Sequence, residues 1–213
     1  MKKFTYLICL ILAISFIGNA VGQTEKEIEK DIKSKALKDA RKEAKRLKKE
    51  GFAVAPGQLP MDKQIENTWF KRYEMTDDGN QMYFVADARS VGETHATAKM
   101  QAYEVAKINL AGQIGTEVAG LIETTLGNAQ LNAEDAASVT ETVANFKSKV
   151  VTDMGRTLTF FEASRTIDKN TEVTVSIGYS YKTALEMAKK KIRGELKEQG
   201  KVNAEKLDEI LDF

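Results

Sequence analysis

The hydrophobic pattern of the chain opens with a nearly unbroken apolar run from Phe4 to Ile17. Two lysines precede this run, and the small residues of the stretch 18–22 follow it. This order is typical of a secretory signal peptide, and the run is shorter than the ~20 residues of a membrane-spanning helix. We therefore expect residues 1–22 to be removed on export, which leaves Gln23 as the first residue. Cleavage after Ala20 and an uncleaved N-terminal anchor are the alternatives.

The single cysteine, Cys9, lies inside this apolar run. A lipidation signal places its cysteine after a small residue at the end of the run, whereas Cys9 follows Ile8. We interpret Cys9 as part of the signal peptide, so that the mature chain has neither a thiol nor a disulfide. No second apolar run of about 18 residues follows it in the sequence.

Residues 25–50 predict a charge-dense helix with 11 basic and 7 acidic residues, and Gly51 is a natural stop for it. Its sparse apolar positions step by 3, 4 and 3 along one narrow stripe: Leu37, Ala40, Ala44 and Leu47. Between Lys33 and Lys49 nine basic residues stand against two acidic ones. One interpretation is a solvated helix with one face laid on the domain. The other is a basic arm for anionic lipid or glycan.

Turn residues mark 52–60 as a loop, and the pattern after it predicts a helix over 61–73. The inward face of this helix would carry Ile65, Trp69 and Tyr73, which recur at every fourth position. Such spacing predicts that the tryptophan anchors a core and does not serve as a ligand platform.

Residues 81–91 alternate between apolar and polar side chains after a turn at 77–80, which predicts a strand. The longest helical pattern follows over 93–126. Its expected inward stripe is Met100, Tyr103, Ala106, Leu110, Ile114, Val118, Leu121 and Leu126. Each interior glycine lowers helix propensity by about 1 kcal/mol. The glycines of this segment therefore indicate the close approach of another element, or a break in the helix near Gly112 and Gly115.

A one-sided stripe from Ala136 to Val150 predicts the next helix, with Asn132 as its cap. Because few residues separate it from the preceding helix, we expect an antiparallel helical hairpin. Beyond Gly155 the period changes to two, which predicts a half-buried β-hairpin built from residues 157–166 and 171–181. A last helix over 182–199 and a short turn of helix after it complete the pattern. Their expected inward residues are Leu185, Ala188, Ile192, Leu196, Leu207, Ile210 and Leu211.

This order of elements predicts an α+β fold in which a small antiparallel sheet packs against a long helical hairpin, with flanking N- and C-terminal helices. A fourth short strand is possible near Ala53 or within 152–166. The 213 residues, with 42% hydrophobic and 30% charged side chains, suit one globular core. We expect a signal peptide, a basic helix, one α+β domain and a C-terminal tail over residues 1–22, 23–51, 52–200 and 201–213.

One helical motif carries a family resemblance. The pattern A-x-x-x-L-A-x-x-I, here Ala106, Leu110, Ala111 and Ile114, follows the strand that ends in Ser90-Val91-Gly92. With the later hairpin, residues 83–181 resemble the LPP-twenty lipoprotein family and the related N-terminal domain of flagellar assembly protein T. The resemblance implies a non-enzymatic envelope protein of a two-membrane bacterium, in the periplasm or at the periphery of the outer membrane. The missing lipidation cysteine departs from the lipoprotein members.

The sequence has no HExxH, CxxC, GxSxG or P-loop motif. The lone His95 cannot make a histidine-rich zinc site. Asp87 stands two residues from Arg89 on the same strand face, which predicts a structural ion pair. Glu117 and Glu123 are six residues apart on one helix and do not converge. We therefore expect no catalytic residue, no metal and no cofactor.

The candidate binding residues are cations: Lys38, Arg41, Lys42, Lys45, Arg46, Lys49, Arg89 and Arg165. If the sheet face opposite the helices is open, its arginines would form a basic face with Tyr83 and Phe161. Otherwise they are ordinary solvated strand positions.

The charge balance of 32 basic to 31 acidic residues describes no polycation, and the helix 25–50 has no aromatic residue. Nucleic acid is therefore a poorly supported partner for an exported protein. The expected function is to bind a partner, either an envelope protein or a second copy. Self-association would pair the stripe of helix 25–50 with its own copy. The alternative is binding to anionic lipid or glycan through the basic helix.

Overall fold

A computed structural model describes residues 25–128, 131–200 and 204–213. The predicted signal peptide and its cleavage sites lie outside these residues, as does Asn203. The chain divides into two compact units, and the first ends at Lys35. The described part of the first unit, residues 25–35, is helical. The second unit, Ala36–Phe213, contains the sheet and the helices that pack on it.

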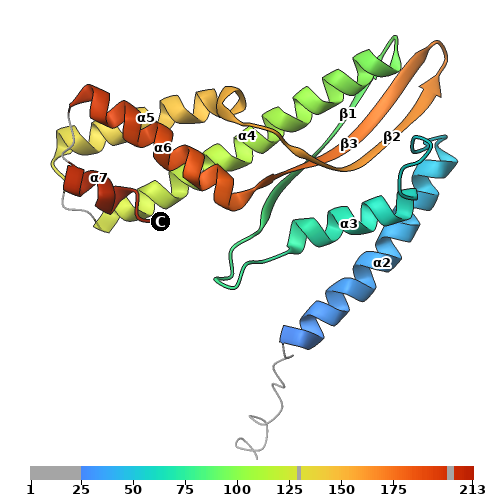
Figure 1. The fold of residues 1–213 in the computed structure, drawn as a ribbon, viewed down its shortest axis with the longest axis horizontal. Helices are drawn as coiled ribbons and strands as arrows, with labels where there is room; N and C mark the ends of the chain where they lie inside the picture. The colour runs from blue at the N-terminus through green and yellow to red at the C-terminus, as the bar shows by residue number, and fades with distance from the viewer. Residues whose placement is uncertain (1–24, 129–130, 201–203) are drawn as a thin grey trace, which may run out of the picture. The chain divides into compact units, whose positions relative to one another are not determined.

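The secondary structure follows the predicted order, and the α+β class is confirmed (Figure 1). The helices are α2 (Glu25–Lys49), α3 (Met61–Tyr73), α4 (His95–Asn128), α5 (Ala133–Asp153), α6 (Tyr181–Gln199) and α7 (Ala204–Ile210). The strands are β1 (Tyr83–Gly92), β2 (Leu158–Ile167) and β3 (Asn170–Ser180). Several boundaries have local causes. Asn132 caps α5 by accepting from the Asp135 backbone N–H at 2.8 Å, and Gly200 ends α6 with a positive φ of 64°.

The three strands form an antiparallel sheet in the order β1-β3-β2. Alternate residues of β3 face α4 and enter the main core: Val173, Val175, Ile177 and Tyr179. The other sheet face is covered by α3 and by the C-terminal half of α2, which share a second apolar cluster with β2. The hairpin is therefore buried on both faces, and the predicted half-buried hairpin is wrong. Ala53 pairs with Ser164 as an isolated bridge, so the fourth strand is reduced to one residue.

A register shift in β2 between Thr159 and Phe161 changes the direction of the side chains there. Phe160 lies over the backbone of Gly178 on β3, and its ring meets Tyr83 edge-on with centroids 5.6 Å apart. A Cβ atom at position 178 would lie 2.2 Å from Phe160 Cε2. Glycine at this position is thus what admits the phenyl ring.

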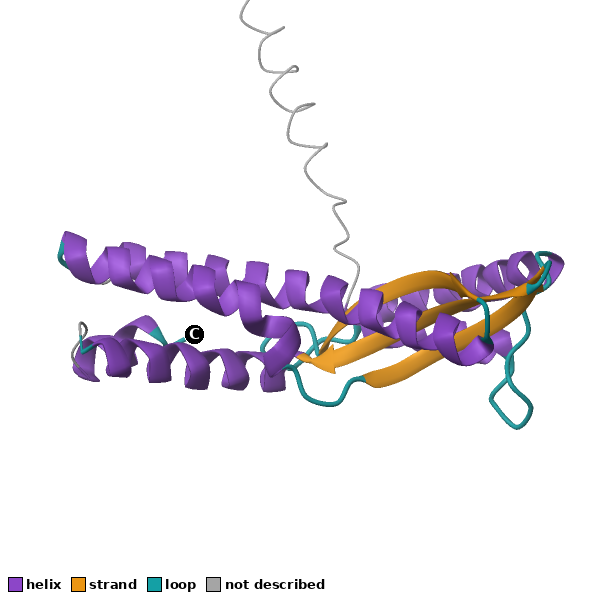
Figure 2. Cartoon of the chain, turned by 90° about the horizontal axis from the view of Figure 1, so that it is seen from above, coloured by secondary structure: helices purple, strands orange, loops and turns teal. Residues whose placement is uncertain are grey.

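The helix α4 is continuous, and the alternative of a break near its glycines is wrong. Seven of its buried residues recur at every fourth position: Ala98, Ala102, Ala106, Leu110, Ile114, Val118 and Ile122. Ala111 and Gly115 are buried beside this line. Because a turn needs 3.6 residues, this line moves about 40° around the helix at each step. The first half of α4 therefore packs on β1 and β3, and the second half packs on α5 (Figure 2). Met100, expected on the inward stripe, is 63% exposed because it lies off this drifting line.

The C-terminal segment packs in the same core as α4. Leu207, Ile210 and Leu211 are buried in the main cluster, as predicted, and the Thr125 hydroxyl donates to the Ile210 carbonyl at 2.9 Å. The residues predicted as a tail are thus continuous with the domain core over their described part, 204–213.

Side chains from neighbouring helices bond to both outer strands of the sheet. Asn109 and Gln113 of α4 donate to the carbonyls of Asp87 and Val85 on β1, at 3.3 and 3.2 Å. On β2, the Glu162 N–H donates to the Gln64 side chain at 3.1 Å. The Ala53 bridge engages both backbone groups of Ser164. These contacts fix α3 and α4 in register with the strands that they cover.

Candidate functional site

The C-terminal half of α2 is placed by a glycine stop and a buried stripe. Gly51 has a φ of 90°, its N–H bonds to the Lys48 carbonyl, and the Phe52 N–H bonds to the Leu47 carbonyl at 2.9 Å. This pair of bonds is the Schellman arrangement, which brings the residue after the stop against the last turn. Leu47 and Phe52 accordingly meet in one apolar cluster.

Three residues of the predicted α2 stripe are buried against the domain. Ala40, Ala44 and Leu47 are 0%, 3% and 2% exposed, and they share a cluster with Phe161 and Ala163 of β2. The helix is therefore docked through residues 40–47, as one interpretation predicted. These three side chains are already covered within the chain, and pairing of the helix 25–50 with a second copy stays a prediction.

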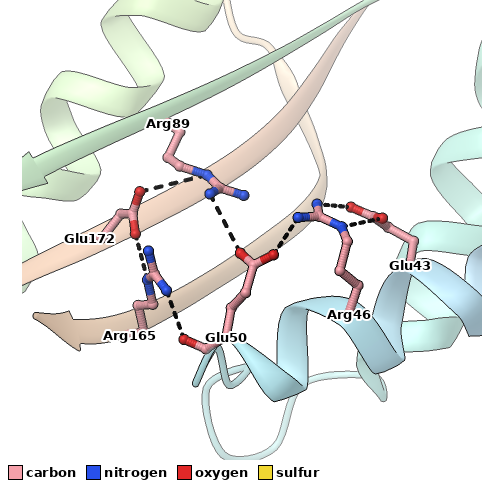
Figure 3. Close-up of polar contacts among 6 residues, drawn as sticks. All are labelled: Glu43, Arg46, Glu50, Arg89, Arg165 and Glu172. Atoms are coloured by element: carbon pink, nitrogen blue, oxygen red, sulfur yellow. Dashed lines mark hydrogen bonds and ion pairs between the residues drawn. The ribbon is translucent and has the colours of Figure 1, made fainter.

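Charges of alternating sign connect α2 to the sheet (Figure 3). On α2, Arg46 lies between two acids: its Nε donates to Glu43 Oε2 at 2.9 Å, and its guanidinium also bonds to Glu50. The hydrogen bond from Arg46 holds the pKa of Glu43 below its usual value, against a smaller opposing effect of burial. Two of the acids of α2 are therefore neutralised on one flank of the helix.

The network continues from Glu50 onto all three strands. Arg89 of β1 lies 3.7 Å from Glu50 and 3.7 Å from Glu172 of β3, and Arg165 of β2 pairs with Glu172 at 2.5 Å. Arg165 also donates to the Glu50 carbonyl at 2.8 Å. Both strand guanidiniums lie 4.8 Å from the ring centre of Phe52. Three arginines and three glutamates thus balance in charge and hold the end of α2 on the sheet.

The structure separates the predicted binding residues into two groups. Arg46, Arg89 and Arg165 belong to the balanced network, so they do not extend the positive surface of α2. The open sheet face on which the strand arginines would have met Tyr83 and Phe161 does not exist, because α2 and α3 cover it. That expectation is wrong for a tertiary reason: the sequence does not show which helix covers which face.

The remaining five cations share the exposed side of α2, and we call them the basic face: Lys38, Arg41, Lys42, Lys45 and Lys49. Every one of the five is exposed, and no ion pair joins them to an acid of the described chain. At 3.6 residues per turn they fall within an arc of about 100°, centred about 150° away from the buried stripe. Docking of the stripe therefore turns the basic face outward.

Two of the three acids considered for catalysis make structural contacts, and the third, Glu123, is exposed on α4. Asp87 pairs with Arg72 of α3 at 2.6 Å and accepts from the Ser176 hydroxyl, so the predicted pair with Arg89 is wrong. Glu117 accepts from the Tyr181 hydroxyl at 3.0 Å. His95 is exposed at the start of α4. Among the described residues, no group of three histidines, cysteines and acids converges on a possible metal site.

A second polar cluster joins α4 to β2. The Tyr103 hydroxyl lies 2.7 Å from Thr159 Oγ1 and donates to Glu162 at 2.9 Å, and Lys99 pairs with the same carboxylate at 2.9 Å. Burial raises the pKa of Tyr103 to about 12, with a contribution from Glu162. Burial, followed by the Glu117 contact, likewise raises the pKa of Tyr181 to about 12. Both hydroxyls act as structural donors and not as bases.

An open groove of about 500 Å³ lies between the turn before β1 and the start of α6. Met82, Tyr181 and Leu185 contribute apolar surface to it, and Phe213 lines one side. Lys189 donates to the Phe213 carbonyl and lies 4.5 Å from its ring centre. No sequence pattern indicated this groove, because its walls come from three separate segments.

Comparison of the chain with family models, curated proteins and solved structures finds no match. The resemblance to the LPP-twenty family therefore stays a prediction. Within the described ranges, no helix combines the length and the apolar character that crossing a membrane requires.

Proposed function

We propose that this protein is an exported, non-enzymatic envelope protein that acts by binding a partner, and that the basic face of α2 is where an anionic partner binds. The pattern of basic, apolar and small residues over 1–22 supports export. The family resemblance of residues 83–181 supports the envelope and a non-enzymatic role.

The basic face carries the proposal. Five cations line one exposed side of a helix that is fixed to the domain on its other side, and none of them is paired with an acid of the described chain. Three acids lie on the flank beside this face, Asp39, Glu43 and Glu50, and the last two are occupied by Arg46 and Arg89. An anion that approaches this face therefore meets five cations that form no ion pair within the described chain.

The structural use of two of the three candidate acids supports a non-catalytic role. Asp87 and Glu117 are bonded to side chains that hold neighbouring elements together. A general acid or base must instead reach a reacting group in a substrate.

Capture from an envelope extract tests the proposal, with charge variants in place of a deletion. Removing residues 23–50 would uncover Phe161 and Ala163, so a deletion would confound binding with folding. We define a face variant in which five side chains become glutamine: Lys38, Arg41, Lys42, Lys45 and Lys49. A control variant loses five exposed cations elsewhere by the same change: Arg156, Lys169, Lys182, Lys190 and Lys197.

The wild-type protein and the control variant should retain the same envelope component, which mass spectrometry identifies, and the face variant should lose it. Capture of that component by all three proteins would overturn the role of the basic face. Loss of it by both variants would show that net charge, and not this face, determines binding.

A further inference from the structure

We infer that the basic face of α2 rests on an anionic lipid bilayer, with the helix axis parallel to the membrane and no side chain inserted. This inference rests on the proposed function and specifies its partner. It follows from the arrangement of the cations, from the lack of apolar side chains among them, and from the rigid attachment of the helix.

The cations form a line, not a pocket. From Lys38 to Lys49 the basic face runs about 16 Å along the helix at 1.5 Å per residue. No side chain of the face is buried, so the face encloses no ligand. A line of exposed point charges matches headgroups that move laterally in a bilayer. A compact ligand, in contrast, requires donors converging on one place.

The basic face has nothing to insert into hydrocarbon. Between positions 38 and 49 the apolar residues are Ala40, Ala44 and Leu47, and all three are buried on the opposite side of the helix. Amphipathic helices that enter the interface instead turn such residues toward the acyl chains. Attraction to the surface must then be electrostatic, at roughly fivefold in affinity per cation.

The helix is already folded and held before any contact with a surface. The Schellman bonds at Gly51, the buried stripe and the network around Glu50 hold its C-terminal half on the domain. A basic segment that is disordered beforehand has to lose conformational entropy when it binds, and this helix avoids that cost. The network also keeps Glu43 and Glu50 paired with arginines, which limits their repulsion of headgroups.

Sedimentation with vesicles tests the inference. The full chain is expressed with its own N-terminal segment and is purified in the processed form that the cells produce. Mass spectrometry identifies the first residue of that form. Wild-type, face and control variants are spun with vesicles containing about one third phosphatidylglycerol, and with neutral phosphatidylcholine vesicles. Salt is set at about 50 mM and about 500 mM, where the Debye length falls from about 14 Å to about 4 Å. Circular dichroism establishes that each variant is folded.

Wild-type and control proteins should sediment with the anionic vesicles at low salt. The face variant should bind at least about 100-fold more weakly, and high salt should release the wild-type protein by a similar factor. Equal binding of the face variant, or wild-type binding that survives high salt, would overturn the inference.

Failure of this inference can be told apart from failure of the proposed function. A sulfated glycan column, run with the same three proteins, covers the other polyanionic surface of an envelope. If the glycan column retains the wild-type protein but not the face variant, and the wild-type protein does not sediment with anionic vesicles, the lipid inference is wrong and the proposed function is supported. If the face variant and the control variant bind equally to the vesicles and equally to the glycan column, both the lipid inference and the proposed function are wrong.

Discussion

Substitution of Gly178 by alanine tests how the sheet is packed beneath α3. An ideal Cβ on Gly178 lies 2.2 Å from Cε2 and 2.5 Å from Cζ of Phe160, whereas ordinary contact begins at 3.4 Å. The phenyl ring would therefore have to move by about 1.2 Å, which is the difference between 3.4 and 2.2 Å. Phe160 is only 9% exposed and meets Tyr83 edge-on, so little space is open to it.

Two effects of opposite sign determine the change in the free energy of unfolding. Overpacking a well-filled site costs about 1–3 kcal/mol. Replacing glycine by alanine within a strand gains about 0.5–1 kcal/mol, because the unfolded chain has less freedom to lose. The steric effect is larger, so Gly178→Ala should destabilise the protein by about 1–2 kcal/mol.

Urea denaturation measures this change, and a second background isolates its cause. With a slope of about 2 kcal/mol per molar urea, the midpoint should fall by about 0.5–1 M. In a Phe160→Leu background the two clashing ring atoms are absent, so the same substitution should become neutral or stabilising. An equal loss in both backgrounds would refute the clash with the ring, and so would a stabilised Gly178→Ala protein in the wild-type background.

Three further predictions concern α4, the ion-pair network and the half-buried tyrosines. Gly120→Ala should raise the free energy of unfolding by about 0.5–1 kcal/mol, because nothing lies within 4 Å of its added Cβ. Urea melts check this, and destabilisation would contradict a regular α4. Glu172→Gln should lower stability by about 1–2 kcal/mol, because two arginines lose their shared carboxylate. A change below about 0.3 kcal/mol in the same assay would make the network energetically minor. Ultraviolet titration should find Tyr103 and Tyr181 ionising near pH 12. Unfolded tyrosines ionise near pH 10, so stability should fall as the pH rises from about 10 to about 12. Ionisation of both near pH 10 would contradict this.

Local signals in the sequence predicted the elements well. The helix over 61–73 has the predicted bounds, and Asn132 caps α5 as expected. Periodicity and capping depend on residues a few positions apart, so they can be predicted from a single sequence. The stripe from Ala40 to Leu47 also predicted which side of α2 docks, and this side determines where the basic face points.

Only some of the contacts between distant segments could be predicted from the sequence. The pairing of Ile167 with Asn170 across the hairpin turn places Arg165 opposite Glu172, so this ion pair follows from the register of the predicted hairpin. The contact of Arg89 with Glu50 has no such signal, because a helix, two loops and part of a strand lie between them. The polar face of β3 was misleading for a related reason. Its serine and glycine resemble solvated positions, yet Ser176 is buried and pairs with Asp87.

The side-chain bonds at the outer strands affect how this sheet can grow. An exposed edge strand offers unpaired backbone groups that template another strand, and this is a common route to fibres and swapped dimers. Here Asn109 and Gln113 already occupy two carbonyls of β1, while Gln64 and Ala53 interrupt the ladder of β2. An incoming strand would first have to displace these contacts from α3, from α4 and from the loop that follows α2. Concentrating such a protein in a confined compartment or on a surface would therefore carry a low risk of edge-to-edge polymerisation.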